Sequence, residues 1–259
     1  MSIQLSGLRK SFGGKEVLRG FTLTVEDGET SAIVGPSGCG KSVLLKHLVG
    51  LLRPDAGTVF VDGQSVPELT KKELVRLRRR IGYVFQFAAL FDSMTIAANI
   101  GMGLRRLPGW DRKRIASRVE ECLALVDLNG LGERFPAQLS GGQRKRAGLA
   151  RAIAASPKYL LYDEPTTGLD PVTTSVIDQL ILRMRDELGV TALVVTHDMT
   201  SAFRVADRIT LLHEGTARFT GAPAEIRTAT DDVLRGFVDG DPALYYGVQQ
   251  PQRGQEDGA

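Results

Sequence analysis

The chain has 259 residues, 42% hydrophobic and 24% charged, a composition that fits a soluble globular protein and excludes a disordered chain, a collagen and a coiled coil. Its 33 basic and 30 acidic residues leave a net charge of +3, which by itself indicates neither nucleic acid nor an anionic membrane as a partner. The longest apolar runs, 87–91 and 122–126, contain five residues each, whereas a membrane-spanning helix needs about 20.

The first third of the chain reads mainly as strands. Apolar and polar residues alternate around Ile3 and Leu5 and again over 21–25, which is typical of half-buried strands. A short apolar strand then leads into a glycine-rich loop, and the residues after this loop are apolar enough for a buried helix. The predicted elements are strands at about 3–5, 21–25, 30–34 and 57–61 and a helix at 42–52.

The rest of the chain is first helical and then alternates between strands and helices. Ile115, Val119, Cys122 and Val126 recur at helical spacing. The predicted elements are helices at 73–80, 144–155 and 172–184, further helices between about 95 and 156, and strands at 81–85, 159–162, 190–195 and 209–212. Strands that alternate with helices indicate a mostly parallel sheet, and the helical block between them indicates an inserted subdomain. From Gln249 onward the composition predicts disorder.

The segment 35–42 carries the first chemical signal. It reads Gly-Pro-Ser-Gly-Cys-Gly-Lys-Ser and fits the pattern G-x-x-x-x-G-K-[ST] between a predicted strand and a predicted helix. Its glycines let backbone N–H groups turn toward phosphate oxygens, and the helix N-terminus adds a favourable dipole. Lys41 is predicted to reach the β- and γ-phosphates of a nucleotide and Ser42 to bind Mg²⁺. The predicted nucleotide-binding residues of this loop are Gly35, Pro36, Ser37, Gly38, Cys39, Gly40, Lys41 and Ser42.

Two carboxylates follow the strand predicted at 159–162. Asp163 and Glu164 would lie at the carboxyl edge of the sheet, where ligands bind in open α/β folds. Asp163 is predicted to help hold Mg²⁺, and Glu164 to polarise the attacking water. The alternative is a strand that ends in a solvated turn, which the phosphate loop elsewhere in the chain disfavours.

Residues 139–143 read Leu-Ser-Gly-Gly-Gln ahead of a predicted helix. Ser140 is a good N-cap, and the glycines leave backbone N–H groups free for a second phosphate contact; a helix cap and nothing more is the other interpretation. The pentapeptide, about 20 residues before the acidic strand, resembles the signature of ATP-binding cassette (ABC) ATPases. This resemblance covers roughly residues 3–225, with seven motifs in the right order. It implies nucleotide contacts by Ser140, Gly141, Gly142 and Gln143.

The resemblance also gives roles to residues that carry little signal singly. Gln86 looks like the glutamine that senses Mg²⁺ and faces the transmembrane partner, and His197 like the switch histidine that contacts the γ-phosphate. The segment 168–170 looks like the D-loop, which makes Asp170 a nucleotide contact. Phe12 occupies the place of the aromatic residue that stacks on adenine, where the family often has tyrosine. The predicted catalytic residues are therefore Glu164, His197 and Gln86, and the predicted metal ligands are Ser42, Gln86 and Asp163.

Three weaker features bear on alternatives. Cys39 lies at a helix N-terminus, where the pKa of a thiol can fall, but we favour a small filler residue over a redox role. The basic residues of 71–80 lack interleaved aromatic residues, so we interpret them as a solvated helix face and expect no nucleic-acid partner. Two cysteines form no disulfide framework and residues 1–10 lack a signal-peptide core, which predicts a reducing, cytosolic setting.

The resemblance implies an α/β fold with a P-loop NTPase (RecA-like) core, an antiparallel β subdomain and a helical subdomain inserted at about 92–156. We expect an ABC ATPase domain over 1–225 and a C-terminal tail over 226–259, whose last 11 or so residues are disordered. The implied cofactors are ATP and Mg²⁺. The implied assembly is a head-to-tail homodimer with two ATP molecules between the subunits.

Residues 87–95 and 233–240 resemble the ATPase subunit of Mla/Mce-type phospholipid transporters, although 87–91 could instead be ordinary subdomain core. This resemblance implies a subunit that hydrolyses ATP to drive a separate membrane permease at the cytoplasmic face of the inner membrane. An MCE-type lipid-binding protein and a STAS-domain protein are further implied partners. In such a complex Phe237, Tyr245 and Tyr246 would anchor the tail on the neighbouring subunit. An ATPase for a polar-solute importer, of amino-acid type, and a non-transport ABC protein are the alternatives.

Overall fold

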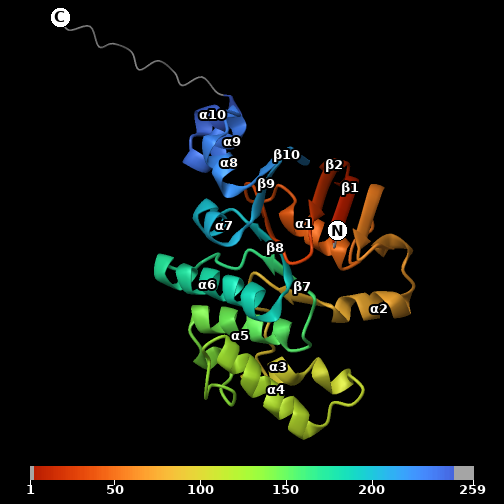
Figure 1. Cartoon of the computed structure of the whole chain (residues 1–259), viewed down its shortest axis with the longest axis vertical. Coiled ribbons are helices and arrows are strands. Elements are labelled where there is room, and N and C mark those ends of the chain that lie inside the picture. Colours follow the sequence, from red (N-terminus) through yellow and green to blue (C-terminus); the bar gives the residue numbers. More distant parts are fainter. Residues whose placement is uncertain (1–2, 248–259) are drawn as a thin grey trace, which may run out of the picture.

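The computed structural model describes residues 3–247 and places them in two sheets with helices around them (Figure 1). The smaller sheet is antiparallel, with the strand order β2-β1-β4-β5. Its strands are β1 (Ile3–Phe12), β2 (Lys15–Val25), β4 (Ala56–Val61) and β5 (Gln64–Ser65). The predicted strands around 3–5 and 21–25 are the first and last parts of a long hairpin, which turns at 13–14.

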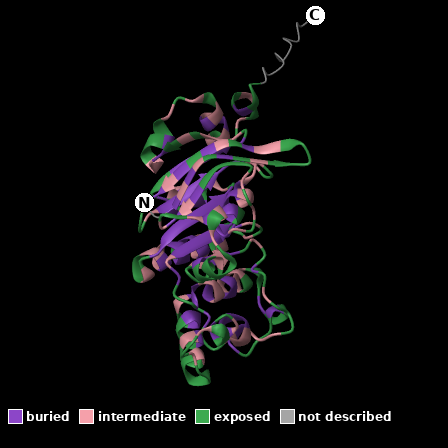
Figure 2. Cartoon of the chain, turned by 90° about the vertical axis from the view of Figure 1, so that its right-hand side faces the viewer, coloured by how far each residue is buried: buried purple, intermediate pink, exposed green. Residues whose placement is uncertain are grey.

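The larger sheet has the strand order β10-β9-β3-β8-β7-β6. Its strands are β3 (Thr30–Val34), β6 (Ile81–Val84), β7 (Tyr159–Asp163), β8 (Thr191–Thr196), β9 (Arg208–His213) and β10 (Thr216–Gly221). All neighbours from β6 to β9 are parallel, and β10 is antiparallel to β9. Every residue of β3, β7 and β8 is buried, as expected for parallel strands covered on both faces (Figure 2).

Ten α-helices accompany the sheets over residues 3–247. They are α1 (Lys41–Leu48), α2 (Lys71–Arg79), α3 (Ile96–Gly101), α4 (Arg112–Leu125), α5 (Gly141–Ile153), α6 (Pro171–Leu188), α7 (Met199–Val205), α8 (Pro223–Thr228), α9 (Asp232–Asp239) and α10 (Pro242–Tyr246), with 3₁₀ turns at Val66–Glu68, Leu104–Arg106 and Pro136–Gln138. Helices α3 and α4 form a lobe at one end of the molecule, and α5 joins it to the sheet (Figure 1). None of these helices has the length and apolarity needed to cross a bilayer.

The architecture confirms the predicted α/β fold with an antiparallel sheet and a helical insertion. One apolar core cluster joins the faces of α3, α4, α5 and α6 to the larger sheet, and a second one fills the space between the two sheets around α1. The predicted helical face at Val119, Cys122 and Val126 is buried in the first cluster. Because β3, β7 and β8 are adjacent and parallel, their carboxyl ends, and the loops that follow them, meet at one sheet edge.

Some element boundaries differ from the sequence predictions. The helix predicted at 42–52 begins one residue earlier and ends at Leu48, because Gly50 adopts the left-handed conformation with φ 61° and turns the chain. The strand predicted at 81–85 ends at Val84, which leaves Phe85 41% exposed at the start of the following loop. Helix α7 and strand β10 are short elements that the periodicity of the sequence did not predict.

The C-terminal helices pack on this fold rather than trailing from it. Ile226 and Leu234 are fully buried in a third apolar cluster with residues of β3 and β9, and the predicted boundary at 225/226 falls inside α8. Tyr245 is 9% exposed, and its hydroxyl lies 3.0 Å from His213 Nδ1. Tyr245 and Phe237 therefore pack within their own chain, whereas Tyr246 is 69% exposed, and the predicted anchoring of these residues on a neighbouring subunit stays a prediction. The predicted disorder from Gln249 concerns residues outside those that the structure describes.

Removal of the Tyr245 side chain is expected to destabilise the fold. Tyr245→Ala should lower the free energy of unfolding by about 3 kcal/mol, because a large aromatic ring leaves a packed site. Tyr245→Phe keeps the ring and loses only the contact with His213, so it should cost about 1 kcal/mol. Tyr246, which is 69% exposed, provides the control Tyr246→Ala. Urea midpoints followed by circular dichroism measure these differences, and equal midpoints for Tyr245→Ala and the unmodified chain would argue against docking of α10.

Candidate functional site

The loop 35–42 joins the buried strand β3 to the N-terminus of α1. Gly40 is the N-cap of α1 with φ 112°, and a Cβ there would lie 2.8 Å from Val17 Cγ1. A Cβ on Gly35 would lie 2.6 Å from the Leu212 carbonyl oxygen. Both positions require glycine because other atoms approach them closely. Gly40 requires it also for its positive φ. The loop is held in a fixed curve that ends at the N-terminus of α1, where the Val43 N–H donates to the Gly40 carbonyl oxygen at 3.0 Å. Helix N-termini in general leave backbone N–H groups without intrahelical partners, and these are available to an anion.

Lys41 is the first residue of α1, and its side chain folds back over the loop. Its ammonium donates hydrogen bonds to the carbonyl oxygens of Gly35 at 2.8 Å and Pro36 at 3.0 Å. The same nitrogen lies 3.1 Å from Glu164 Oε1, and the Lys41 side chain is only 5% exposed. A buried cation inside a phosphate-sized loop is well placed for an anion, and in this structure the Glu164 carboxylate is its charged partner.

Asp163 ends β7 and receives two hydroxyl hydrogen bonds. Ser42 Oγ donates to Asp163 Oδ1 at 2.7 Å, and Tyr83 Oη donates to Asp163 Oδ2 at 2.9 Å. Burial and the neighbouring Asp163 carboxylate raise the pKa of Tyr83, so its hydroxyl stays a donor at all physiological pH values. Sequence reasoning missed Tyr83. The available signal was register: Tyr83 pairs with Leu161, two residues before Asp163 and on the same face.

The oxygens of Ser42 and Asp163 fit a magnesium ion. Hydroxyl and carboxylate oxygens are ligands that Mg²⁺ prefers, and it usually takes one or two protein ligands together with phosphate oxygens and water. Within residues 3–247 no group of three or more His, Cys, Asp or Glu side chains could hold a metal by itself. An ion at this edge of the sheet would therefore need the phosphates of a bound nucleotide to complete its coordination.

Glu164 follows Asp163 in a strained left-handed conformation, with φ 50°. Its Oε2 accepts hydrogen bonds from His197 Nδ1 at 2.7 Å and from Thr167 Oγ1 at 3.2 Å. His197 comes directly after β8, so two adjacent strands bring the acid and the histidine together. Sequence reasoning missed Thr167, and also Lys145 of α5, whose ammonium lies 3.4 Å from the Glu164 carbonyl oxygen. Burial lowers the pKa of Lys145.

A cavity of about 370 Å³ lies over these groups. It brings together eight of the predicted residues: Ser37, Gly38, Gly40, Lys41, Ser42, Gln86, Glu164 and His197. Val17 and Thr167 line it as well, and sequence reasoning had assigned a role to neither. Its size is within the range of small-ligand pockets, and its lining combines glycine backbone, one cation, one carboxylate and several polar donors. This arrangement can bind a phosphate chain and hold a carboxylate and an imidazole next to its end.

The other predicted nucleotide contacts do not line this cavity. Ser140 is exposed and caps α5: its Oγ accepts from the Gln143 N–H at 3.2 Å, and Gln143 Oε1 accepts from the Ser140 N–H. Asp170 caps α6 by accepting hydrogen bonds from the N–H groups of Val172 and Thr173. Phe12 is 43% exposed at the β1–β2 turn, with the Lys10 ammonium 5.5 Å from its ring centre. Within one chain, the segment 140–143 and the cavity at Lys41 are therefore separate surfaces.

The structure also bears on the predictions for Cys39 and for the basic stretch 71–80. Burial raises the pKa of the Cys39 thiol, which favours the interpretation of Cys39 as a filler residue over a redox role. The basic stretch 71–80 is mostly helix α2, where Leu77 is the buried residue. Two of its arginines bind protein groups: Arg78 donates to the Val49 carbonyl at 2.8 Å, and Arg80 forms an ion pair with Asp62.

Tyr83→Phe is expected to weaken the apparent affinity for Mg²⁺ during nucleotide hydrolysis by about threefold to tenfold, because one hydrogen bond to a charged acceptor is lost. The fold should be retained, since the ring and its stacking on Phe85 at 4.3 Å remain. Tyr162→Phe is the matched control, because Tyr162 is buried nearby and its hydroxyl has no hydrogen-bond partner among residues 3–247. Hydrolysis rates titrated with Mg²⁺ measure the effect, and equal half-saturation for both variants would exclude Tyr83 from orienting Asp163.

Comparisons with known proteins agree with this geometry. The family model described as ABC transporter matches residues 18–167. A probable ribonucleotide transport ATP-binding protein, Mkl of Mycobacterium tuberculosis, is 42% identical over 240 residues, which are 93% of this chain and 67% of that protein. The sulfate/thiosulfate import ATP-binding protein CysA 1 of Chromobacterium violaceum is 44% identical over 229 residues, 87% of this chain and 63% of that protein. The chain therefore spans about two thirds of the length of these relatives.

A solved structure is similar over nearly its whole length. It is the dimer of the ATP-binding cassette MJ0796 in a post-hydrolysis state bound to ADP and Pi, with a TM-score of 0.78 and 33% sequence identity. The similarity covers 85% of this chain and 98% of that one. The match confirms the fold that the sequence motifs implied.

Proposed function

The chain belongs to the ABC transporter family as an ATP-binding, ATP-hydrolysing subunit, and from this premise we propose that it powers a separate membrane permease that moves phospholipids. The observation that carries the enzymatic part is the cavity in which Lys41, Ser42, Glu164 and His197 converge. In this proposal Lys41 holds the β- and γ-phosphates, Ser42 and Asp163 hold Mg²⁺ with Gln86 beside them, and Glu164 orients the attacking water. His197 contacts the γ-phosphate. Phosphoryl transfer needs such positioning and charge stabilisation more than covalent help.

The proposed active form is a head-to-tail homodimer. The segment 140–143 is largely exposed and separate from the cavity of its own chain, so a phosphate chain bound at Lys41 is open on that side. A second copy would bring its Ser140, Gly141, Gly142 and Gln143 over the nucleotide, with backbone N–H groups at the N-terminus of α5 facing phosphate. Asp170 would then contact the partner subunit at the nucleotide, and Phe12 would contact the adenine. The dimeric MJ0796 cassette, solved with ADP and Pi, supports this arrangement.

The surface after Gln86 is the proposed docking site for the permease. Phe87 is 84% exposed and Phe91 50% exposed. Ala88 and Ala89 between them are both left-handed, with φ 57° and 50°, and Arg151 of α5 donates to the Ala88 carbonyl at 2.8 Å. A strained loop held by a half-buried arginine presents two aromatic rings to solvent, which is typical of an interaction site. Docking here would place the chain peripherally at the cytoplasmic face of the inner membrane.

Two cargo classes have support. Residues 87–95 and 233–240 resemble the ATPase of Mla/Mce-type transporters, which favours phospholipid together with MCE-type and STAS-domain partners. The relative CysA 1 favours a polar anion instead, since that protein is a sulfate/thiosulfate import ATP-binding protein. We place phospholipid first because one of the two resembling segments, 87–95, lies in the proposed permease docking site, whereas identity across the cassette reports the shared ATPase.

The test is purification of the tagged chain with its membrane partners in mild detergent, followed by measurement of ATP hydrolysis. The phospholipid proposal expects a permease and an MCE-type lipid-binding subunit in the purified complex, and stimulation of hydrolysis when phospholipid is added. A complex with a solute-binding protein, whose hydrolysis responds to sulfate or an amino acid, would replace the lipid proposal with the polar-solute one. Recovery of an active ATPase with no permease would support a non-transport ABC protein.

A further inference from the structure

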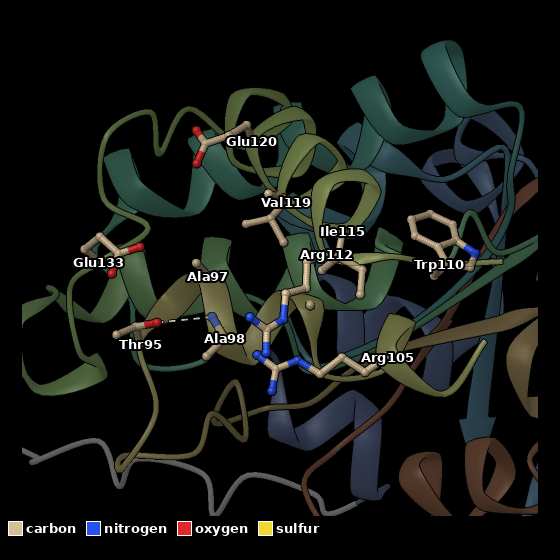
Figure 3. Close-up of a pocket in the computed structure, with 12 residues that line it drawn as sticks. Thr95, Ala97, Ala98, Arg105, Trp110, Arg112, Ile115, Val119, Glu120 and Glu133 are labelled. Carbon is tan, nitrogen blue, oxygen red and sulfur yellow. Dashed lines mark hydrogen bonds between the residues drawn. The ribbon is translucent and has the colours of Figure 1, made fainter. Parts of the chain in front are cut away.

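The helical lobe contains a pocket of about 640 Å³ that shares no residue with the cavity at Lys41. Its apolar wall is made by small and branched side chains of α3 and α4, among them Ala98, Gly101, Ile115 and Val119 (Figure 3). A Cβ on Gly101 would lie 3.0 Å from Ile115 Cγ2, so glycine at this position lets the two helices pack closely at the pocket floor. This volume is within the range of pockets that bind small organic ligands.

Two cations converge at one side of this pocket. The guanidinium groups of Arg105 and Arg112 point toward each other from different elements, the 3₁₀ turn Leu104–Arg106 and the first turn of α4 (Figure 3). Within residues 3–247 neither guanidinium has a hydrogen bond or an ion pair with another protein group. Most of the arginines around them do have such partners; Arg118 of the same helix, for example, binds Glu121 and two backbone carbonyls. Both side chains are exposed, so water weakens the repulsion between them, and an anion between the two guanidinium groups would offset it.

The local helix geometry adds to this positive charge. The first turn of α4 carries Arg112, Lys113 and Arg114, and one carboxylate, that of the N-cap Asp111, accepts a hydrogen bond from the Arg114 N–H at 2.8 Å. The helix N-terminus thus has three cations against one acid, although cations are unfavourable there. The pocket does have two carboxylates, Glu120 and Glu133, but they line its opposite end, beyond Ala97 and Val119 (Figure 3). They are therefore not placed to neutralise the arginine pair. The pocket has a cationic end, an apolar middle and an acidic far end.

We propose that this pocket binds a small amphipathic anion, an alkyl or acyl chain that carries a phosphate or carboxylate headgroup. The headgroup lies between Arg105 and Arg112, where two guanidinium groups can each donate paired hydrogen bonds to its oxygens. The chain lies along Ala98, Gly101, Ile115 and Val119. The site is independent of the transported cargo and of the hydrolytic centre.

Trp110 makes this proposal directly measurable. It lines the pocket and is the single tryptophan of the chain, so tryptophan emission reports on the surroundings of Trp110. Trp110 also borders a neighbouring hollow at Lys113 and Ser117, so the variants described next are needed to assign a signal to this pocket. The full chain is titrated with octyl phosphate below its micellar concentration, and Trp110 emission should change to a saturating value. Inorganic phosphate, which lacks the chain, and octyl glucoside, which lacks the charge, should each bind at least tenfold more weakly. Isothermal titration calorimetry with the same probes detects any binding that leaves the fluorescence unchanged.

A pair of matched variants separates this site from general surface charge. Arg105→Gln with Arg112→Gln removes the two converging cations, and Arg106→Gln with Lys113→Gln removes two neighbouring cations that do not line the pocket. The first pair should weaken octyl phosphate binding at least tenfold, and the second less than twofold. These surface substitutions should leave the thermal midpoint unchanged, which circular dichroism checks. A further arm with phosphatidic acid vesicles shows whether a membrane lipid headgroup, as well as a free anion, can reach the site.

Three results would overturn the proposal. One is the absence of saturable octyl phosphate binding by both fluorescence and calorimetry. Another is an equal loss of binding in the two double variants, which would indicate attraction by the general basic surface. The third is inorganic phosphate binding as tightly as octyl phosphate, which would leave no role for the apolar wall.

Discussion

Glu164→Gln is expected to leave ATP binding within about twofold of the unmodified chain and to slow ATP hydrolysis by about a hundredfold or more. Glutamine has nearly the shape of glutamate, so it can stay beside His197 and Thr167, but its neutral amide cannot polarise a water molecule as a carboxylate does. In the structure the Glu164 carboxylate lies between two groups that a γ-phosphate would contact, with Lys41 at 3.1 Å and His197 at 2.7 Å. The rate is measured as released phosphate at saturating ATP, and binding with a non-hydrolysable analogue.

The matched control is Glu133→Gln, an exposed carboxylate in the helical lobe that should change neither quantity. A near-normal turnover rate for Glu164→Gln would remove Glu164 as the key carboxylate. A loss of ATP binding together with the rate would show instead that Glu164 mainly supports the phosphate loop. The variant should also accumulate the ATP-bound dimer, which size-exclusion chromatography with ATP would detect.

Sequence motifs predicted the site well where its chemistry lies in one short segment. The motif at 35–42 requires a strand directly before it, a tight turn within it and a helix that starts at its end. The curvature of the loop and the position of Lys41 therefore follow from local geometry. Asp163 and Glu164 follow a buried strand for the same reason. Gln86 and His197 came from resemblance, and the structure places both beside the same cavity because β6, β7, β8 and β3 end at one sheet edge.

The missed residues depend on contacts between distant segments. Tyr83 reaches Asp163 only because β6 pairs with β7 in one register, and Lys145 reaches the Glu164 carbonyl only because α5 packs beside β6 and α6. A single sequence contains no local pattern for such pairs. The C-terminal helices show a different limit of prediction from sequence. Leu234 and Phe237 recur at helical spacing, so their helix is visible in the sequence. The sequence pattern shows an apolar face, but it does not tell whether that face packs on its own chain or on a neighbour.

The ion pair between Lys41 and Glu164 links the two key residues before nucleotide binds. Both side chains are nearly buried, at 5% and 11% exposure, and each is the other's charged partner. A γ-phosphate that reaches Lys41 must therefore replace the Glu164 carboxylate. Glu164 would then keep His197 and Thr167 as partners and present a free oxygen to water. In the proposed mechanism, ATP binding would both fill the site and release the Glu164 carboxylate from Lys41.

Lys41→Ala is consequently expected to weaken ATP binding about a hundredfold. Two charge-assisted hydrogen bonds to phosphate, at about 1.5 kcal/mol each, are lost, and 3 kcal/mol corresponds to roughly that factor. Alanine also leaves Glu164 without its cation, so like-charge repulsion between the carboxylate and the phosphates is no longer offset. Lys41→Arg keeps the charge and changes the geometry. The lysine lies buried against two carbonyls, where a planar guanidinium does not fit. The affinity for ATP should therefore fall in this variant as well.

Binding of a fluorescent ATP analogue measures these affinities, and Lys113→Ala, at an exposed position of α4, is the control that should bind normally. Unchanged binding by Lys41→Ala would place the nucleotide elsewhere. If Lys41→Arg bound normally while Lys41→Ala did not, charge alone would account for the affinity, and the buried hydrogen bonds to Gly35 and Pro36 would have no part in positioning the lysine. A loss in both variants with a retained fold would show that the phosphates need an ammonium held in place by the loop carbonyls.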